Sequence, residues 1–116
     1  MHKESLDEVY IDELLQKVLK ADFDELHLLP HLQPLMQSHN VGRPVVLDEY
    51  EMMKRAQAQR MIYDVMSDEQ IVELENNGVI FLHYFGVGIG YFNVFATRTE
   101  HGVISRFRFV TRENRL

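Results

Sequence analysis

The sequence predicts an α+β domain in which three helices pack on a mainly antiparallel sheet of about five to six strands. Three observations lead to this prediction. The chain begins with one amphipathic helical pattern, and two more follow one another in its middle. Short segments interrupted by prolines lie between them, and from Gly78 onward β-branched and aromatic residues dominate. The order helix, three strands, two helices, three strands is typical of this class.

A capping box is expected at the start of the first helix. Ser5 is followed three residues later by Glu8, a spacing at which each side chain satisfies a free backbone N–H. Apolar residues then recur at the spacing of one buried helical face, at Ile11, Leu14, Leu15, Val18 and Leu19. We expect this helix to end near Lys20 and Ala21.

Three short strands are expected next. Residues 25–29 alternate in polarity and stop at a proline, which cannot donate to a strand ladder. A second strand is predicted over residues 35–37, and a third over residues 44–47, after a turn at 40–42. The alternation places His27 on one face of the sheet.

Two successive helices are expected in the middle of the chain. Asp48 and Glu51 predict an N-terminal cap for the first of them. Its buried face is predicted to consist of Ala58, Met61, Ile62, Val65 and Met66. The second helix is predicted to begin at the Ser67 and Gln70 capping box and to end at the left-handed pair Asn77-Gly78. Four methionines of this region are expected to fill the core, with a flexible partner groove as the alternative: Met52, Met53, Met61 and Met66.

Three strands joined by short antiparallel hairpins are predicted over residues 78–85, 90–98 and 103–110. The stretch GVGIG at residues 86–90 also suggests a phosphate-binding loop. Such loops are directly followed by a helix, and the P-loop motif ends in a lysine followed by serine or threonine. Here a strand follows and no such lysine exists, so we predict a hairpin turn.

Charge is distributed unevenly along the chain, whose net charge of -6 argues against broad binding to nucleic acid or to anionic membranes. Residues 1–28 hold eight acids against three lysines, whereas residues 91–116 hold five arginines against two acids. In the last strand Arg106 and Arg108 alternate with phenylalanines, so the strand is expected to present guanidinium groups on its unburied face. This asymmetry is interpreted as two solvated faces of opposite sign, with protein docking as the alternative.

Length and composition limit the organisation of the chain. Its 116 residues predict a single domain over 1–116. With 0 cysteines there is no disulfide framework, and the N-terminal residues do not form a secretory signal pattern. The longest apolar run, near residues 79–92, is interrupted by His83 and glycines and is too short to cross a bilayer. We therefore expect a cytoplasmic protein without membrane insertion.

The candidate chemical groups do not form an enzyme pattern. His27, His31 and His39 cluster in the sequence, but Pro30 disfavours the continuous helix that would bring the first two onto one face. No serine, histidine and aspartate arrangement or activated nucleophile stands out. We expect no catalytic residue, no cofactor and no metal site.

Three segments resemble a known family when they are taken in order. ADFDELHLLPHLQPLM, at residues 21–36, is similar to the motif near the start of PilT-class ATPases of type IV pilus retraction and type II secretion. RMIYDVMSDEQIVELE, at 60–75, is similar to the helix pair that follows in that family. GYFNVFATRTEHGVISRFRFV, at 90–110, resembles its later hairpin. The resemblance extends over about residues 8–110.

The resemblance implies a PAS-like N-terminal domain, which in that family packs on the RecA-like ATPase domain of a neighbouring subunit in a hexameric ring. The Walker motifs and the catalytic carboxylate of the family lie in that other domain, so the resemblance implies that this chain is not an enzyme. Gln37, Ile89 and Tyr91 stand where the family has arginines, and those that align with Ile89 and Tyr91, in the hairpin, approach nucleotide in the family. Their replacement disfavours an accessory nucleotide role, because no amide or aromatic ring replaces a fixed cation facing phosphate.

Three functions follow from the resemblance. The first is a non-catalytic interaction module of pilus or twitching-motility machinery. It docks on a pilus or secretion motor ATPase, or on itself as a homo-oligomer, through a sheet edge and the face that holds Arg98, Arg106 and Arg108. The second is a PAS-like sensor of a small ligand. The third is an excised N-terminal fragment of a complete secretion ATPase.

Overall fold

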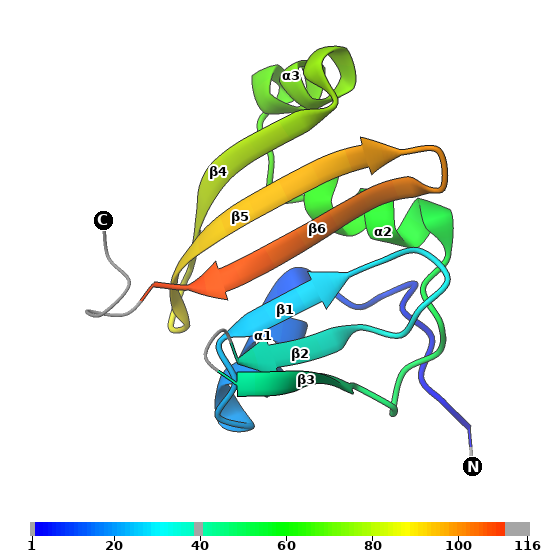
Figure 1. Ribbon diagram of the computed structural model, residues 1–116, viewed down its shortest axis with the longest axis vertical. Helices are drawn as coiled ribbons and strands as arrows, with labels where there is room; N and C mark the ends of the chain where they lie inside the picture. Colours follow the sequence, from blue (N-terminus) through cyan, green and yellow to red (C-terminus); the bar gives the residue numbers. More distant parts are fainter. Residues whose placement is uncertain (1, 39–40, 111–116) are drawn as a thin grey trace.

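Three helices cover one face of a six-stranded antiparallel sheet, which confirms the predicted α+β class (Figure 1). The computed structural model describes residues 2–38 and 41–110. The helices are α1 (Ile11–Lys20), α2 (Arg55–Tyr63) and α3 (Asp68–Asn77). The strands are β1 (Glu25–Leu28), β2 (Leu35–Ser38), β3 (Val41–Val46), β4 (Val79–Gly86), β5 (Gly90–Thr99) and β6 (Gly102–Phe109).

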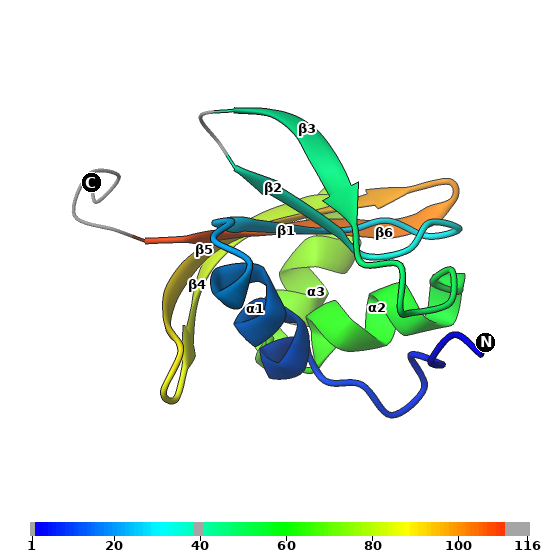
Figure 2. The same ribbon diagram turned by 90° about the horizontal axis from the view of Figure 1, so that it is seen from below.

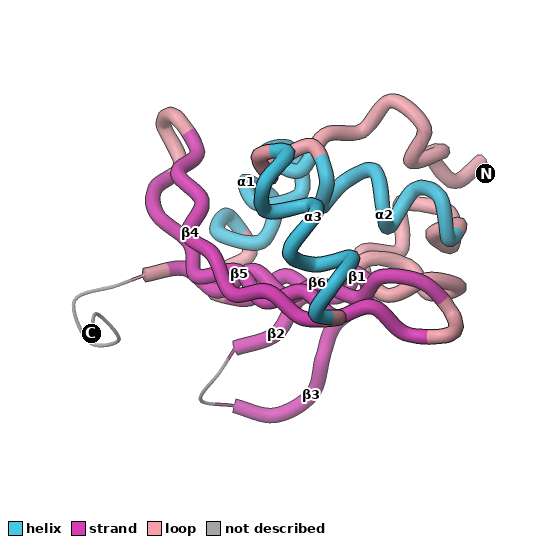
Figure 3. The backbone as a smooth tube through the Cα atoms, turned by 90° about the horizontal axis from the view of Figure 1, so that it is seen from above, coloured by secondary structure: helices cyan, strands magenta, loops and turns pink. Residues whose placement is uncertain are grey.

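The strand order is β3-β2-β1-β6-β5-β4, so the first and the last strand of the chain pair in the middle of the sheet. All three helices lie on the same side, as Figures 2 and 3 show. The hairpin of β2 and β3 rises on the opposite side, whereas the tip of the β4–β5 hairpin bends toward the helices (Figure 2). The sheet therefore has one covered face and one open face.

The core lies between the helices and the covered face. Leu26, Val94 and Phe107 are neighbours on three adjacent strands and are fully buried. The predicted apolar face of α1 packs against them, with four of its five residues buried and Leu19 partly buried. The helical periodicity of α1 therefore predicted its buried face correctly.

The predicted cap at Ser5 and Glu8 is wrong, because α1 begins only at Ile11. The Ser5 hydroxyl instead accepts a hydrogen bond from the backbone N–H of Asp7 at 3.2 Å. Leu6 and Val9, in the segment between, are buried in the core. Burial of these two side chains therefore places this segment in a packed turn before the helix.

The predicted cap at Asp48 and Glu51 is also wrong. Helix α2 begins at Arg55, where the Gln57 side chain accepts a hydrogen bond from the Lys54 backbone N–H at 2.8 Å. The segment before it is irregular, and its backbone N–H groups bond to Pro34, Glu4 and Leu32. This segment buries Tyr50 and Met53, which local capping patterns do not reveal.

The expected core role of the methionines is confirmed for Met53, Met61 and Met66 and is wrong for Met52, which is exposed. Neither Met52 nor Met53 belongs to α2, since both precede its first residue. The helix also ends at Tyr63, so Met66 and the partly buried Val65 lie in the connection to α3. Their apolar contacts were predicted, but not their position outside the helix.

Helix α3 is bounded as expected. The Ser67 hydroxyl accepts from the backbone N–H of Gln70, and the Gln70 side chain accepts from the backbone N–H of Ser67. Gly78 follows the helix with φ 82°, a left-handed conformation that glycine adopts without steric cost. Asn77 remains helical, so the expectation of a left-handed pair holds only for the glycine.

The predicted turns of the sheet have two outcomes. GVGIG forms the hairpin turn between β4 and β5, closed by a hydrogen bond from the Ile89 N–H to the Gly86 carbonyl at 3.0 Å. By contrast, strand β3 begins at Val41, so the turn expected at 40–42 is wrong for Val41 and Gly42, which belong to the strand. Asn40, like His39 and the chain after Val110, lies outside the described residues. None of the described helices is long and apolar enough to span a membrane.

Candidate functional site

The open face of the sheet carries two continuous rows of side chains, because directly opposed residues of antiparallel strands point to the same side. The first row crosses all six strands through Phe81, Phe95, Arg106, His27, Leu35 and Val46. The second row crosses five strands through His83, Asn93, Arg108, Glu25 and Gln37. The open face is defined by these rows and by their neighbours Val79, Phe85, Tyr91, Thr97 and Ile104.

Four aromatic rings form a patch on β4 and β5 within this face. Phe81, Phe85, Tyr91 and Phe95 are 60%, 52%, 58% and 37% exposed. The rings of Phe85 and Tyr91 lie 4.6 Å apart. Such rings are enriched in the buried centres of protein interfaces. This aromatic patch therefore has the composition of a protein-binding surface.

The charged groups beside the patch are mostly cationic. Arg106 lies over the Phe95 ring, with its guanidinium carbon 6.0 Å from the ring centre, and is exposed. Among the described residues no carboxylate pairs with it. Glu25 is the only acidic residue in the six strands as the structure describes them. The open face therefore carries more positive than negative charge in a chain whose net charge is -6.

Glu25, on the open face, is buried, and its carboxylate already contacts two neighbouring side chains. Its carboxylate lies 2.9 Å from His27 Nε2 and accepts a hydrogen bond from that nitrogen when the nitrogen carries a proton. Its other oxygen lies 3.8 Å from Arg108 Nε, an ion-pair distance that is too long for a hydrogen bond. The Arg108 Nε is buried without a hydrogen-bond partner in the described structure. Glu25 thus balances one cation and leaves Arg106 uncompensated.

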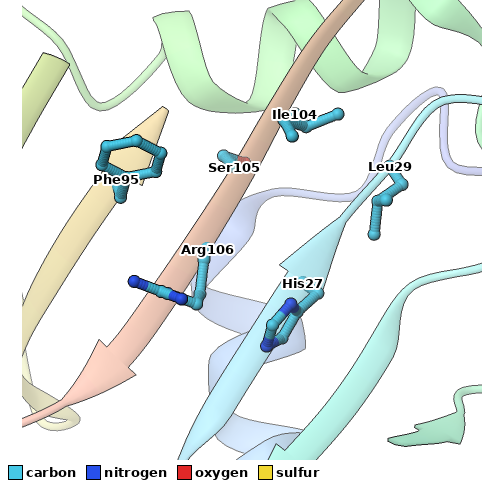
Figure 4. Close-up of a pocket in the computed structure, with 6 residues that line it drawn as sticks. All are labelled: His27, Leu29, Phe95, Ile104, Ser105 and Arg106. Carbon is cyan, nitrogen blue, oxygen red and sulfur yellow. The ribbon is translucent and has the colours of Figure 1, made fainter. Parts of the chain in front are cut away.

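An open hollow of about 180 Å³ lies between β1, β5 and β6. Figure 4 shows its lining, which consists of His27, Leu29, Phe95, Ile104, Ser105 and Arg106. Its wall is apolar near Ile104 and Leu29, while Arg106 and His27 lie together at its other end (Figure 4). The volume is below the roughly 300–1,000 Å³ of sites that enclose a small ligand. The hollow has the size and chemistry to receive a side chain of a protein partner.

The three arginines predicted to form one docking face do not share a face. Arg106 and Arg108 lie on the open face, but Arg98 is opposite the buried Val103 and therefore points to the helix side. Its guanidinium donates a hydrogen bond at 2.5 Å to the Glu75 carbonyl in the last turn of α3. A cation at this position satisfies a free carbonyl of the helix terminus. Arg98 therefore acts as a cap for α3, and the expectation of a common face is wrong.

Sequence reasoning missed the aromatic patch, although its signal was present. Phe81, His83 and Phe85 alternate with buried residues along β4, the pattern of side chains on one face of a strand. Aromatic residues of strands are usually assigned to the core, and here half of them point outward. The position of His27 beside Arg106 had no local signal, because it results from the pairing of the first and last strands.

The positions at which the resemblance implied missing arginines lie in different places. Gln37 is opposite Glu25 on the open face, and its side chain donates to the Gly42 carbonyl at 3.2 Å. Tyr91 belongs to the aromatic patch. Ile89 lies in the β4–β5 turn and packs against the core. None of these three side chains is a cation. Gln37 and Tyr91 offer only an amide and a hydroxyl for contacting phosphate, and Ile89 offers no polar group.

The two edges of the sheet differ. Strand β3 contains Arg43 and Pro44 and pairs with β2 through an irregular register, devices that hinder pairing with another chain. Strand β4 has eight residues without a proline or a formally charged residue. Of the two described edges, β4 therefore fits the predicted docking edge.

On the helix side, two tyrosine hydroxyls form hydrogen bonds that connect α1 to the rest of the fold. Tyr50 donates to Glu13 at 2.5 Å, and Tyr84 donates to Asp12. Burial, followed by the bond to the carboxylate, raises the pKa of each tyrosine to about 12. Among the described residues no group of three or more His, Asp or Glu side chains is placed to hold a metal ion. The polar contacts of the helix side are structural.

The fold is similar to part of a pilus retraction motor and to part of an ATPase, both of known structure. One is the ADP-bound pilus retraction motor PilT, with a TM-score of 0.82 and 21% identity over 90% of this chain. The other is the ATPase DotB of Legionella pneumophila, with a TM-score of 0.70 and 12% identity over 95% of this chain. No protein-family model and no curated protein sequence matches the chain.

The match spans only 30% of the PilT chain and 32% of the DotB chain. At these identities the likeness is one of fold. It confirms the resemblance to PilT-class motors that the sequence motifs indicated, over nearly the whole of this chain and about one third of a motor subunit.

Proposed function

We propose that this chain is a non-catalytic protein-interaction module that docks through the open face of its sheet on a pilus or secretion motor ATPase, or on a copy of itself. The observation that carries the proposal is the exposed aromatic patch beside Arg106, which pairs with no carboxylate of the described residues. The likeness to about one third of PilT and DotB supports the choice of partner class. In this proposal the module acts in the cytoplasm, in the setting of pilus retraction and twitching motility.

The composition of the open face favours protein docking over the alternatives. Aromatic residues and arginine dominate the energetic centres of interfaces. About half of each ring is exposed, so covering one ring stabilises a complex by roughly 1 kcal/mol before the cost of association. Four such rings contribute roughly 4 kcal/mol, which offsets only the lower end of the cost of association, so a specific complex also needs the Arg106 contact and further contacts around the patch. A small-ligand sensor receives less support, because the hollow on this face is open and holds only about 180 Å³.

A capture experiment tests this function. The purified chain, its Arg106→Glu variant and a Lys20→Glu variant are immobilised and exposed to lysate of the native cells. Lys20 is an exposed cation in the last turn of α1 on the other side of the molecule, so it is the matched control. We expect the wild type and the control to retain a motor ATPase, identified by mass spectrometry, and Arg106→Glu to lose it.

The same experiment contradicts the proposal in two ways. Retention of the same ATPase by Arg106→Glu would exclude the open face as the docking surface. Absence of any pilus or secretion ATPase from all captures, together with a lack of self-association, would exclude the proposed partners.

A further inference from the structure

Opposite charges are separated on the two sides of this molecule. Among the described residues of the open face Arg106 has no acidic partner, and the single acid there, Glu25, is buried. The exposed acids of the described chain lie mostly in the N-terminal segment and in the helices, on the other side of the sheet (Figure 2). The covered side of one copy is therefore electrostatically complementary to the open face of another.

Helix α3 has the strongest acidic character of the three helices. It contains four acids and no lysine or arginine, whereas α1 and α2 each contain two basic residues. Glu69 and Glu73 are exposed and form no ion pair with the described residues. Val72 lies between them on the same side and is 53% exposed. This stripe combines an apolar centre with two free carboxylates.

The stripe matches the open face in spacing as well as in charge. Glu69 and Glu73 are four residues apart on a helix, which is about 6 Å along its axis. Arg106 and Arg108 are two residues apart on a strand, which is about 7 Å. With Glu73 placed at Arg106 and Glu69 at Arg108, Val72, which directly precedes Glu73, lies near Arg106 and therefore near the hollow. The hollow is apolar on the side of Ile104 and Leu29.

We propose that the open face binds helix α3 of a second copy of this chain. In this contact Glu73 lies on Arg106, Glu69 lies on Arg108, and Val72 points toward the hollow. This inference rests on the open face being the docking surface of the proposed function and names one occupant for it. In Figures 1 and 2 α3 lies on the helix side, next to β4, so a copy cannot place its own α3 on its own open face. The contact is therefore head to tail, and repetition of it forms a closed ring or an open filament.

Sedimentation velocity of the purified chain over a range of concentrations tests this contact. We expect association that grows with concentration and weakens from 0.01 M to 0.15 M salt, where the Debye length falls from about 30 Å to about 8 Å. Arg106→Glu and Glu73→Lys are each expected to weaken it at least about tenfold. Glu8→Lys, which reverses an exposed acid of the N-terminal segment, is the matched control and is expected to associate like the wild type.

Mixing the two variants tests whether Arg106 and Glu73 meet across the contact. Arg106→Glu retains an intact α3, and Glu73→Lys retains an intact open face. An equimolar mixture has one unaltered interface and one in which both charges are reversed but still opposite, so it is expected to regain association. A mixture that stays monomeric would overturn the proposal, as would unchanged self-association of Glu73→Lys.

Failure of the α3 contact can be distinguished from failure of the proposed function. A wild-type chain that stays monomeric at every concentration, but captures a motor ATPase through Arg106, overturns only the α3 contact. Normal folding of each variant is checked by circular dichroism and urea unfolding, so loss of association is not loss of structure.

Discussion

Alanine substitutions along β5 provide a sharp test of the two-faced sheet, because neighbouring residues of one strand point in opposite directions. Phe92 is buried under the helices, and its ring lies 5.4 Å from that of Phe109. Phe95, three residues later, lies on the open face. Both are phenylalanines of the same strand, so differences in side-chain type and strand propensity cancel.

Phe92→Ala removes a buried ring and leaves a cavity, which costs about 3–5 kcal/mol of the free energy of unfolding. That is a large share of the roughly 5–15 kcal/mol available to a domain. Phe95→Ala removes a ring that is 37% exposed, and we expect a smaller loss of about 1–2 kcal/mol. For partner binding the order is reversed, with a loss at Phe95 and none at Phe92 while the chain remains folded.

Urea unfolding followed by circular dichroism measures the two losses of unfolding free energy, provided that the dependence of this free energy on urea concentration is the same in each variant. The capture experiment measures the two effects on partner binding. Equal destabilisation by the two substitutions would refute the assignment of faces, as would loss of partner capture by a folded Phe92→Ala variant alone.

Three further predictions concern single contacts. Ser67→Ala removes the side-chain cap of α3 and is expected to lower the free energy of unfolding by about 1 kcal/mol, measured by urea unfolding. Gly90→Ala is expected to cost more than about 1 kcal/mol in the same assay, because φ is 128° and the new Cβ would lie 2.7 Å from Phe109 Cε1. The raised pKa of Tyr50 and Tyr84, about 12 in the folded chain against 10.0 for a free tyrosine, favours the neutral hydroxyl in the fold. Their contribution is complete below pH 10 and is lost as the pH rises toward 12, so thermal unfolding between pH 9 and 12 should show a fall in stability that Tyr50→Phe and Tyr84→Phe make shallower.

The elements with local signals were predictable from the sequence. Helix α3 was bounded correctly because the capping box at Ser67 marks its start and Gly78 marks its end. The caps expected at Ser5 and Asp48 failed because the segments that follow are held by burial of Leu6 and Tyr50, a tertiary effect. Local capping patterns compete poorly with the burial of large apolar side chains.

The candidate site was only partly predictable. Arg106 and Arg108 were assigned to one face by their alternation along a single strand, which requires no knowledge of pairing. The wrong placement of Arg98 depended on the register of the β5–β6 hairpin. There Thr99 pairs with Gly102 across a two-residue turn, which puts Arg98 opposite Val103. The predicted strand bounds, 90–98 and 103–110, already implied this pairing, and parity along the second strand then separates Arg98 from the other two.

The most direct test of the docking surface is an aromatic NMR spectrum of the isotope-labelled chain, recorded with and without a purified PilT-class motor ATPase. We predict that signals of Phe81, Phe85, Tyr91 and Phe95 shift or broaden, while Tyr10, which is 66% exposed beside α1, is unchanged. A change at Tyr10 with all four rings unchanged, or no change at any ring, would contradict docking through the open face.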